Sequence, residues 1–195
     1  MASQTEICNL ALLRLGAPPI TNITDLTKTA IALNSNYDTV RDIVLRDHPW
    51  NFATKRVSLA RIGTAPAWGF SYAYQLPSDC LRVIGIQDPN ATYNDDIDPA
   101  MGFKIEGDHL LTDEETVYLK YIYRATIAGE YDSRFVSAFA SRLAAEVAYY
   151  ITGSSGLKEQ MMKEYSFEIA GARSIDAQEN PADAVEDSRW ADARL

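Results

Sequence analysis

Residues 36–60, NYDTVRDIVLRDHPWNFATKRVSLA, contain the point at which the chain changes from a helical to a β-type pattern. In the first half, Val40 and Val44 continue a series of apolar residues at alternating steps of three and four, which is typical of a helix with one buried face. Pro49 cannot extend that helix, because it has no backbone N–H and its ring clashes with the preceding turn. From about Phe52 to Arg124 the chain consists of short segments of strand-forming residues. The stretch therefore predicts a helix that ends before Pro49 and a β region that follows it directly.

Three other segments have the periodicity of helices with one apolar face. The first lies between Ser3, which has capping-box spacing to Glu6, and Gly16. Another begins after Asp132, an expected N-cap, and the last follows the break TGSSG at 152–156. Two helices are therefore expected on each side of the β region.

The β region consists of short segments rich in Val, Ile, Tyr and Phe, separated by Gly, Pro or Asp. KIEGDHLL (104–111) has the form of a hairpin that turns at Gly107 and Asp108. TVYLKYIYRA (116–125) alternates with the period of a strand, and DPNATYNDDIDPAMG (88–102) has the composition of a loop. These patterns predict an antiparallel β region.

The order of elements predicts the fold class. Short connections within each helix pair favour antiparallel neighbours. We therefore predict an α+β fold, in which an antiparallel four-helix bundle is interrupted by an antiparallel β insertion and followed by an extended C-terminal arm. The expected parts are residues 1–51 and 129–180 for the helical bundle, 52–128 for the β-rich insertion and 181–195 for the arm.

Acidic residues are concentrated in one part of the sequence. The chain has a net charge of −9, and between residues 88 and 115 nine carboxylates stand against a single cation, Lys104. Nucleic acids are bound by Lys and Arg, so such a surface repels phosphates and argues against sequence-specific DNA binding. An acidic loop is expected within this stretch, and its central carboxylates are Asp95, Asp96 and Asp98.

Motifs that carry catalysis or hold cofactors are absent from the sequence. It has no Gly-rich phosphate loop, nucleophile elbow, zinc-helix motif or dinucleotide fingerprint. Cys8 and Cys80 are too few for a disulfide framework, their spacing fits no zinc site, and both are expected to be small core residues. No apolar run approaches the roughly 18 residues of a membrane span. These observations favour a protein that is not an enzyme, binds no cofactor or metal and does not enter a membrane.

The two histidines are the remaining candidates for chemistry. His48 ends a predicted helix just before Pro49, where an imidazole can interact with the last carbonyls, which is a structural role. His109 lies beside the predicted hairpin turn, and a metal site could be drawn around it, although carboxylates in a turn are usually solvated charges. The carboxylates available for such a site are Glu106, Asp108 and Asp113.

The C-terminal segment 181–195 contains six charged residues, and its large apolar groups are Val185, Trp190 and Leu195. It therefore has too little apolar surface to offset the entropy of ordering it alone. It could fold back onto its own bundle or reach a partner, because fifteen residues extend roughly 50 Å at about 3.3–3.6 Å each. Trp and Arg, which it carries, are frequent interface anchors.

Four segments in a common order carry a resemblance to a known family. They are SQTEICNLALLRLGAPPITNITD (3–25), the stretch 36–60, FSYAYQLPSDCLRVIGI (70–86) and DSRWADAR (187–194). Together they resemble bacteriophage head–tail adaptors of the tail tubular protein A type, over the layout of the whole chain.

The resemblance implies a non-enzymatic virion protein that is made in the host cytoplasm and located at the head–tail neck. Adaptors of this type combine an α-helical bundle with a β-rich portion. They form rings, commonly dodecameric, beneath the portal protein, and join the head to the tail nozzle or tail tube. Genomic DNA would pass through the ring without sequence-specific binding.

The resemblance also implies roles for individual residues, because C-terminal segments of such adaptors commonly engage the portal. Residues 181–195 would then be the docking arm, with Trp190 as apolar anchor, Arg189 and Arg194 paired with acidic portal groups, and Leu195 at the end. The acidic loop would face either the DNA channel or the tail-side partner.

Two alternatives remain open from the sequence. The chain could be a cytosolic protein-binding adaptor unrelated to virions. It could also be a metal-dependent hydrolase with His109 and the neighbouring carboxylates at its site.

Overall fold

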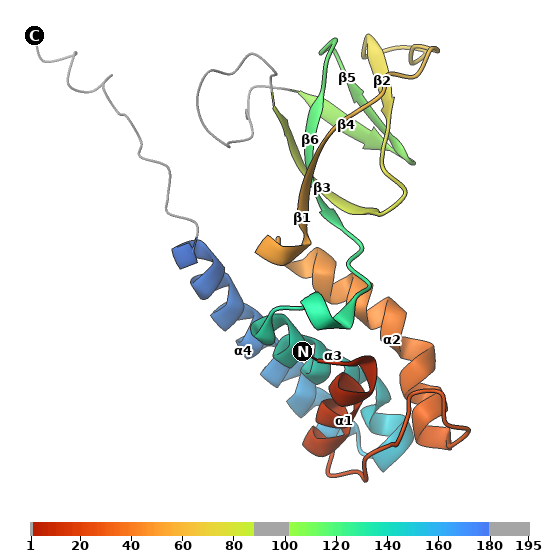
Figure 1. Ribbon diagram of the computed structural model, residues 1–195, viewed down its shortest axis with the longest axis vertical. Helices are drawn as coiled ribbons and strands as arrows, with labels where there is room; N and C mark the ends of the chain where they lie inside the picture. The colour runs from red at the N-terminus through yellow and green to blue at the C-terminus, as the bar shows by residue number, and fades with distance from the viewer. Residues whose placement is uncertain (1, 88–101, 180–195) are drawn as a thin grey trace, which may run out of the picture.

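A computed structural model describes residues 2–87 and 102–179 and has helices at one end and strands at the other (Figure 1). In the described ranges the α-helices are α1 (Gln4–Arg14), α2 (Lys28–Asp47), α3 (Ser133–Thr152) and α4 (Ser155–Glu179). The strands are β1 (Thr54–Ser58), β2 (Tyr72–Gln75), β3 (Cys80–Gln87), β4 (Phe103–Glu106), β5 (His109–Thr112) and β6 (Tyr118–Tyr123). Short 3₁₀ helices, Asn51–Ala53 and Ala128–Glu130, lie where the chain enters and leaves the β lobe.

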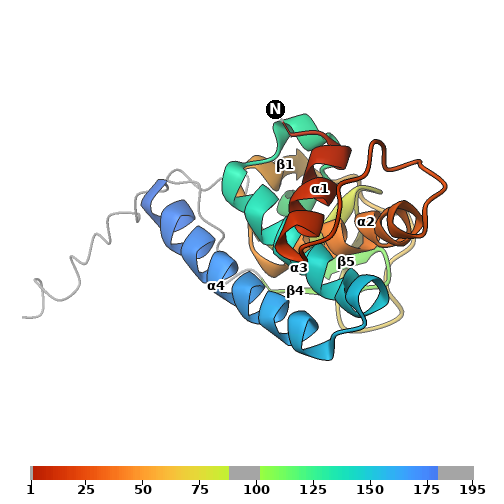
Figure 2. The ribbon, with the colours of Figure 1, turned by 90° about the horizontal axis from the view of Figure 1, so that it is seen from below.

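Helix α3 occupies the centre of the helical lobe, and α1, α2 and α4 all pack against it (Figure 2). Ten of its residues are buried, and five of these are alanines, at positions 138, 140, 144, 145 and 148. Small side chains on several faces let neighbouring helices approach from different directions. The lobe is therefore built around one central helix.

The prediction of a four-helix bundle with a single β insertion is wrong. The structure is an α+β fold whose strands, over the described residues, form two three-stranded antiparallel sheets, ordered β1-β6-β3 and β2-β5-β4. Alternation along a strand shows which residues share a face but does not specify the pairing partner. The two sheets enclose a second core, separate from the helical one, which contains Tyr74, Ile86, Leu110, Val117, Leu119 and Tyr121.

Several local predictions are confirmed. Ser3 and Glu6 form a capping box at the start of α1, and Asp132 caps α3 by accepting from the N–H of Arg134 at 2.7 Å. The β4–β5 hairpin pairs Glu106 with His109, and its turn contains Gly107 at φ 62°. That positive φ explains the glycine, because other residues rarely adopt it.

The described residues contain no helix that is long and apolar enough to cross a membrane.

Arg14 connects three helices of the lobe. Its Nη1 donates to the Ser137 carbonyl of α3 at 2.9 Å, and its guanidinium also bonds to Ser141. On the other side, Nε lies 3.3 Å from a carboxylate oxygen of Glu164 in α4. Since the Arg14 side chain is largely buried, these contacts satisfy a charge inside the lobe and fix α1 and α4 against α3.

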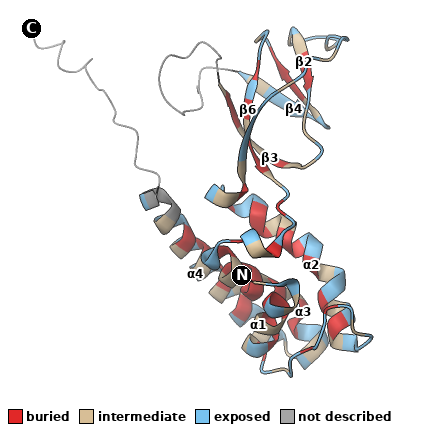
Figure 3. Cartoon of the chain, viewed as in Figure 1, coloured by how far each residue is buried: buried red, intermediate tan, exposed pale blue. Residues whose placement is uncertain are grey.

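Trp50 fills the space between the end of α2 and the start of the β lobe, as its position after Pro49 suggests. It is 1% exposed, and its indole N–H donates to the Val44 carbonyl at 2.9 Å. Its ring packs edge-on against the rings of Phe135 in α3 and His48, with ring centroids 5.2 and 5.0 Å apart. The junction therefore has a packed aromatic centre beside the largely buried α3 (Figure 3). In the β lobe, by contrast, Trp68 is 84% exposed.

The two tryptophans provide a matched test of this core. Trp50→Ala should lower the free energy of unfolding by about 3–5 kcal/mol, because it leaves a large cavity and removes the indole hydrogen bond. Trp68→Ala should change it by less than about 0.5 kcal/mol, because the side chain is exposed. Urea titration followed by circular dichroism measures both, and equal losses would contradict the assignment of the core.

Candidate functional site

The site residues implied by the family resemblance lie outside the described residues. Arg189, Trp190, Arg194 and Leu195 belong to the segment 180–195, and Asp95, Asp96 and Asp98 belong to 88–101. Their roles therefore stay predictions.

His109 pairs with one carboxylate at the hairpin. Its Nδ1 lies 2.9 Å from Oδ1 of Asp108, whose other oxygen accepts from Gln75 Nε2 at 2.9 Å. The hydrogen bond from Gln75 holds the pKa of Asp108 below its usual value. Within 2–87 and 102–179, no group of three or more His, Cys, Asp or Glu side chains is placed to hold a metal ion. The geometry here is that of a hydrogen-bonded turn.

A cavity of about 530 Å³ lies on the outer face of the β2-β5-β4 sheet. The sheet register explains its floor: Ala73 of β2 and Lys104 of β4 both lie opposite Leu111 of β5. Residues directly opposite in antiparallel strands point to the same side. The alternate positions Tyr74 and Leu110 point to the other side and fill the core between the sheets.

The loop of residues 62–70, IGTAPAWGF, forms the wall of this cavity. At its start, the Ile62 N–H donates to the Ala73 carbonyl of β2 at 2.8 Å. Directly after it, the N–H and hydroxyl of Ser71 both donate to Asp113, at 2.8 and 2.9 Å. The loop is thus fixed at both ends, and Trp68 and Phe70 line the cavity between them.

The lining of the cavity suits an apolar group with polar surroundings. Ile62, Ala73 and Leu111 provide the apolar floor, and its volume lies within the roughly 300–1,000 Å³ of small-ligand sites. Lys104 and Glu106 from β4 add one charge of each sign to the lining. Such a pocket can hold a large side chain from another polypeptide while pairing with charges that flank it.

The sequence predicted no role for Trp68 and no pocket beside it. The available signal is the segment TAPAWGF, in which a tryptophan stands among small residues between two strands. The pocket itself requires the loop to lie over a sheet that is completed some forty residues later, by the Ser71–Asp113 contact. Local periodicity does not contain that information.

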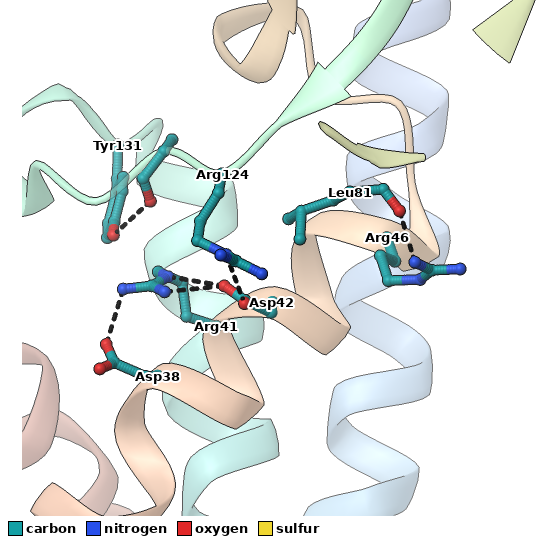
Figure 4. A network of polar contacts seen from close by, with 8 residues as sticks. Asp38, Arg41, Asp42, Arg46, Leu81, Arg124 and Tyr131 are labelled. Atoms are coloured by element: carbon teal, nitrogen blue, oxygen red, sulfur yellow. Dashed lines mark hydrogen bonds and ion pairs between the residues drawn. The ribbon is translucent and has the colours of Figure 1, made fainter. Parts of the chain in front are cut away.

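A network of charged groups joins the two lobes at the end of α2 (Figure 4). Asp42 accepts from Nη2 of Arg41 at 2.8 Å and from Nε of Arg124, just beyond β6, at 2.8 Å. Arg46 of α2 donates to the Leu81 carbonyl of β3. In return, Arg82 of β3 donates to the Arg46 carbonyl at 2.7 Å. Both β3 and β6 are therefore attached to α2 directly.

Tyr131 lies beside this network and is buried. Its hydroxyl donates to the Ala125 carbonyl at 3.0 Å, and burial raises the pKa of the phenol to about 12. Tyr121, in the β core, has its pKa raised to about 12 as well, first by burial and then by its hydrogen bond to Asp79. Both phenols are therefore neutral donors at physiological pH.

Comparison with models of known protein families and with curated proteins finds no match to this chain.

Asp42→Ala tests the junction between the lobes. It removes the shared acceptor of Arg41, which is 4% exposed, and of Arg124, so we expect a loss of roughly 2–3 kcal/mol in the free energy of unfolding. Asp38→Ala is the matched control, because its exposed carboxylate also pairs with Arg41 and should cost less than about 1 kcal/mol. Chemical denaturation of both variants gives the comparison. Equal costs would mean that Asp42 does not have this central role.

The buried tyrosines predict a loss of stability at alkaline pH. Between pH values near 10 and 12 the unfolded chain releases phenolic protons that the folded chain retains, so stability must fall as pH rises through this window. Each such tyrosine contributes a slope of up to about 1.4 kcal/mol per pH unit. Tyr131→Phe should give a shallower decline in urea titrations at pH 9, 10 and 11. The same slope as in the wild type would exclude Tyr131 as a source.

Proposed function

We propose that this chain is a structural virion protein, a head-to-tail adaptor that forms a ring between the portal and the tail nozzle or tail tube. The observation that carries the proposal is the resemblance of four segments, in a common order, to adaptors of the tail tubular protein A type. The protein is not an enzyme in this proposal and acts by contact, and it is located at the neck of the virion.

The arrangement of exposed apolar residues supports a ring. Ring closure requires two different faces of each subunit to meet. Phe167 of α4 is 81% exposed, and Tyr149 and Tyr150 at the end of α3 are also exposed. On another side, Leu26 just before α2 and Ile31 in its first turn are exposed. Helices α4 and α2 lie on different sides of α3 (Figure 2). The helical lobe therefore exposes apolar side chains on two different sides, which fits the two different contact faces that a dodecameric ring needs.

The attachment of the β lobe also supports a connecting role. An adaptor must transmit position from one partner to another, so its two ends have to keep a fixed relative orientation. Asp42, Arg46 and Arg82 join β3 and the end of β6 to α2 by charged hydrogen bonds, which are stronger than neutral ones. In this proposal the arm 181–195 binds the portal, and the acidic loop faces the DNA channel or the tail-side protein.

Removal of residues 181–195 tests the portal contact. Both hydrophobic cores lie within 2–179, so the shortened chain should unfold at the same urea concentration as the full chain. We expect full-length protein mixed with its portal to form rings on the portal in negative-stain images, and the shortened chain to form none. Portal rings decorated equally by both would contradict the arm's role, and no decoration by either would contradict the adaptor proposal.

A further inference from the structure

Among the described residues, no strand pairs with the outer edge of β4. β4 is the edge of its sheet and, within 2–87 and 102–179, pairs with β5 alone. The opposite edge of that sheet is partly used, because Arg61 forms a bridge with Tyr74 of β2 and Ile62 donates to Ala73. Edge strands present unpaired N–H and C=O groups, to which an extended segment can add.

The side chains beside this edge define what such a segment must carry. Lys104 and Glu106 alternate along β4 and lie opposite Leu111 and His109, on the face that contains the pocket. A strand added to β4 would therefore meet a cation and then an anion two residues later. It would also lie next to a pocket with space for a large apolar side chain.

The last residues of the chain match these requirements. Alternate residues of an extended segment share a face, so in WADAR (190–194) the residues Trp190, Asp192 and Arg194 lie together. The alanines at 191 and 193 occupy the other face. Asp192 and Arg194 have the charges opposite to Lys104 and Glu106, in the same order and at the same spacing. Trp190 supplies the apolar group.

We propose that residues 188–195 of a second copy of this chain add to β4 and insert Trp190 into the pocket beside Trp68. Because the charges run in the same order, the added strand is parallel to β4, with Asp192 beside Lys104 and Arg194 beside Glu106. Trp190 then lies near Gly102, which has no side chain. None of the described residues lies within 4 Å of the place that a Cβ on residue 102 would occupy.

The position of the pocket favours a second copy over the chain's own arm. In Figures 1 and 2 the loop 62–70 lies on the side of the molecule away from the C-terminal end of α4, after which the arm begins. Residues 180–187 can span at most about 28 Å. The eight residues of β3 alone are about 26 Å long, so residues 180–187 of the chain's own arm reach hardly farther than the length of one strand of the β lobe. A contact of one copy's arm with the next copy's edge is heterologous, as in a ring.

This self-recognition does not depend on the adaptor role. One arm cannot occupy the pocket and a portal at the same time, so the two sites would compete for Trp190. The peptide assay below contains no portal, so its failure leaves portal binding by the full chain unaffected, and absence of portal rings with the full chain leaves the peptide result unaffected. Failure of one therefore remains distinguishable from failure of the other.

A labelled peptide of residues 186–195 and the chain ending at residue 180 test the proposal directly. Fluorescence polarisation should show saturable binding of this peptide. Replacing Trp190 by Ala in the peptide should weaken binding at least about tenfold, as expected for an aromatic anchor. Absence of saturable binding, or equal binding of the two peptides, would overturn the proposal.

Exchange of charges tests the register. Lys104→Glu should weaken binding of the native peptide about fivefold or more, and a peptide with Asp192→Lys should bind this variant better than the native peptide does. Lys158→Glu, an exposed change on α4, is the control with the same change of net charge and should leave binding unaltered. Equal effects of the two protein variants would overturn the assignment of the pocket edge.

Sedimentation of the full chain separates the two possible sources of the arm. Docking between copies predicts association that grows with protein concentration and is reduced by Lys104→Glu. A monomer at all concentrations would overturn the assignment to a second copy.

Discussion

The carboxylate of Asp42 is the contact on which the relation between the two lobes depends. It accepts hydrogen bonds from two guanidinium groups. One belongs to Arg41 of the same helix, and the other to Arg124, just beyond β6, the central strand of the first sheet. Arg41 is almost fully buried, so its charge requires a partner in the protein. The shared acceptor therefore couples helix packing to strand position. Without it the β lobe would keep the two hydrogen bonds between Arg46 and β3 and the chain crossings at 48–54 and 123–131, but the end of β6 would lose its charged contact with α2.

The sequence contained most of the local structure and little of the arrangement. The capping box at Ser3, the stop at Pro49 and the turn at Gly107 each follow from interactions over a few residues, and all are present. The division of the strands into two sheets depends on pairings such as β1 with β6, whose paired residues are sixty or more positions apart. Alternation is equally compatible with one sheet or two, so the predicted single insertion was wrong.

Helix α3 illustrates the same limit for the helices. Large residues such as Phe135, Phe139 and Leu143 recur at helical spacing and predict one buried face. The residues between them are mostly small, and several of them are buried as well, which places α3 among three other helices. An alanine fits both an exposed and a buried position, so its pattern alone does not distinguish an outer helix from a central one. The pocket lined by Trp68 was missed for a related reason, since its walls come from segments that only the fold brings together.

The negative net charge of −9 does not extend to every face of the molecule. On the first sheet, Arg56 of β1 lies directly opposite Lys120 of β6. On the other side of β6, Arg82 of β3 lies opposite Ile122, two residues beyond Lys120 on the same strand. Opposed residues of paired strands share a face, so this sheet carries cations although the chain as a whole is acidic. In a ring that lets DNA slide, cations on the channel wall would hold phosphates and slow the passage. The proposed adaptor role therefore constrains the orientation of each subunit: the sheet face with Arg56 and Lys120 must point away from the channel, toward a neighbouring subunit or the outer surface.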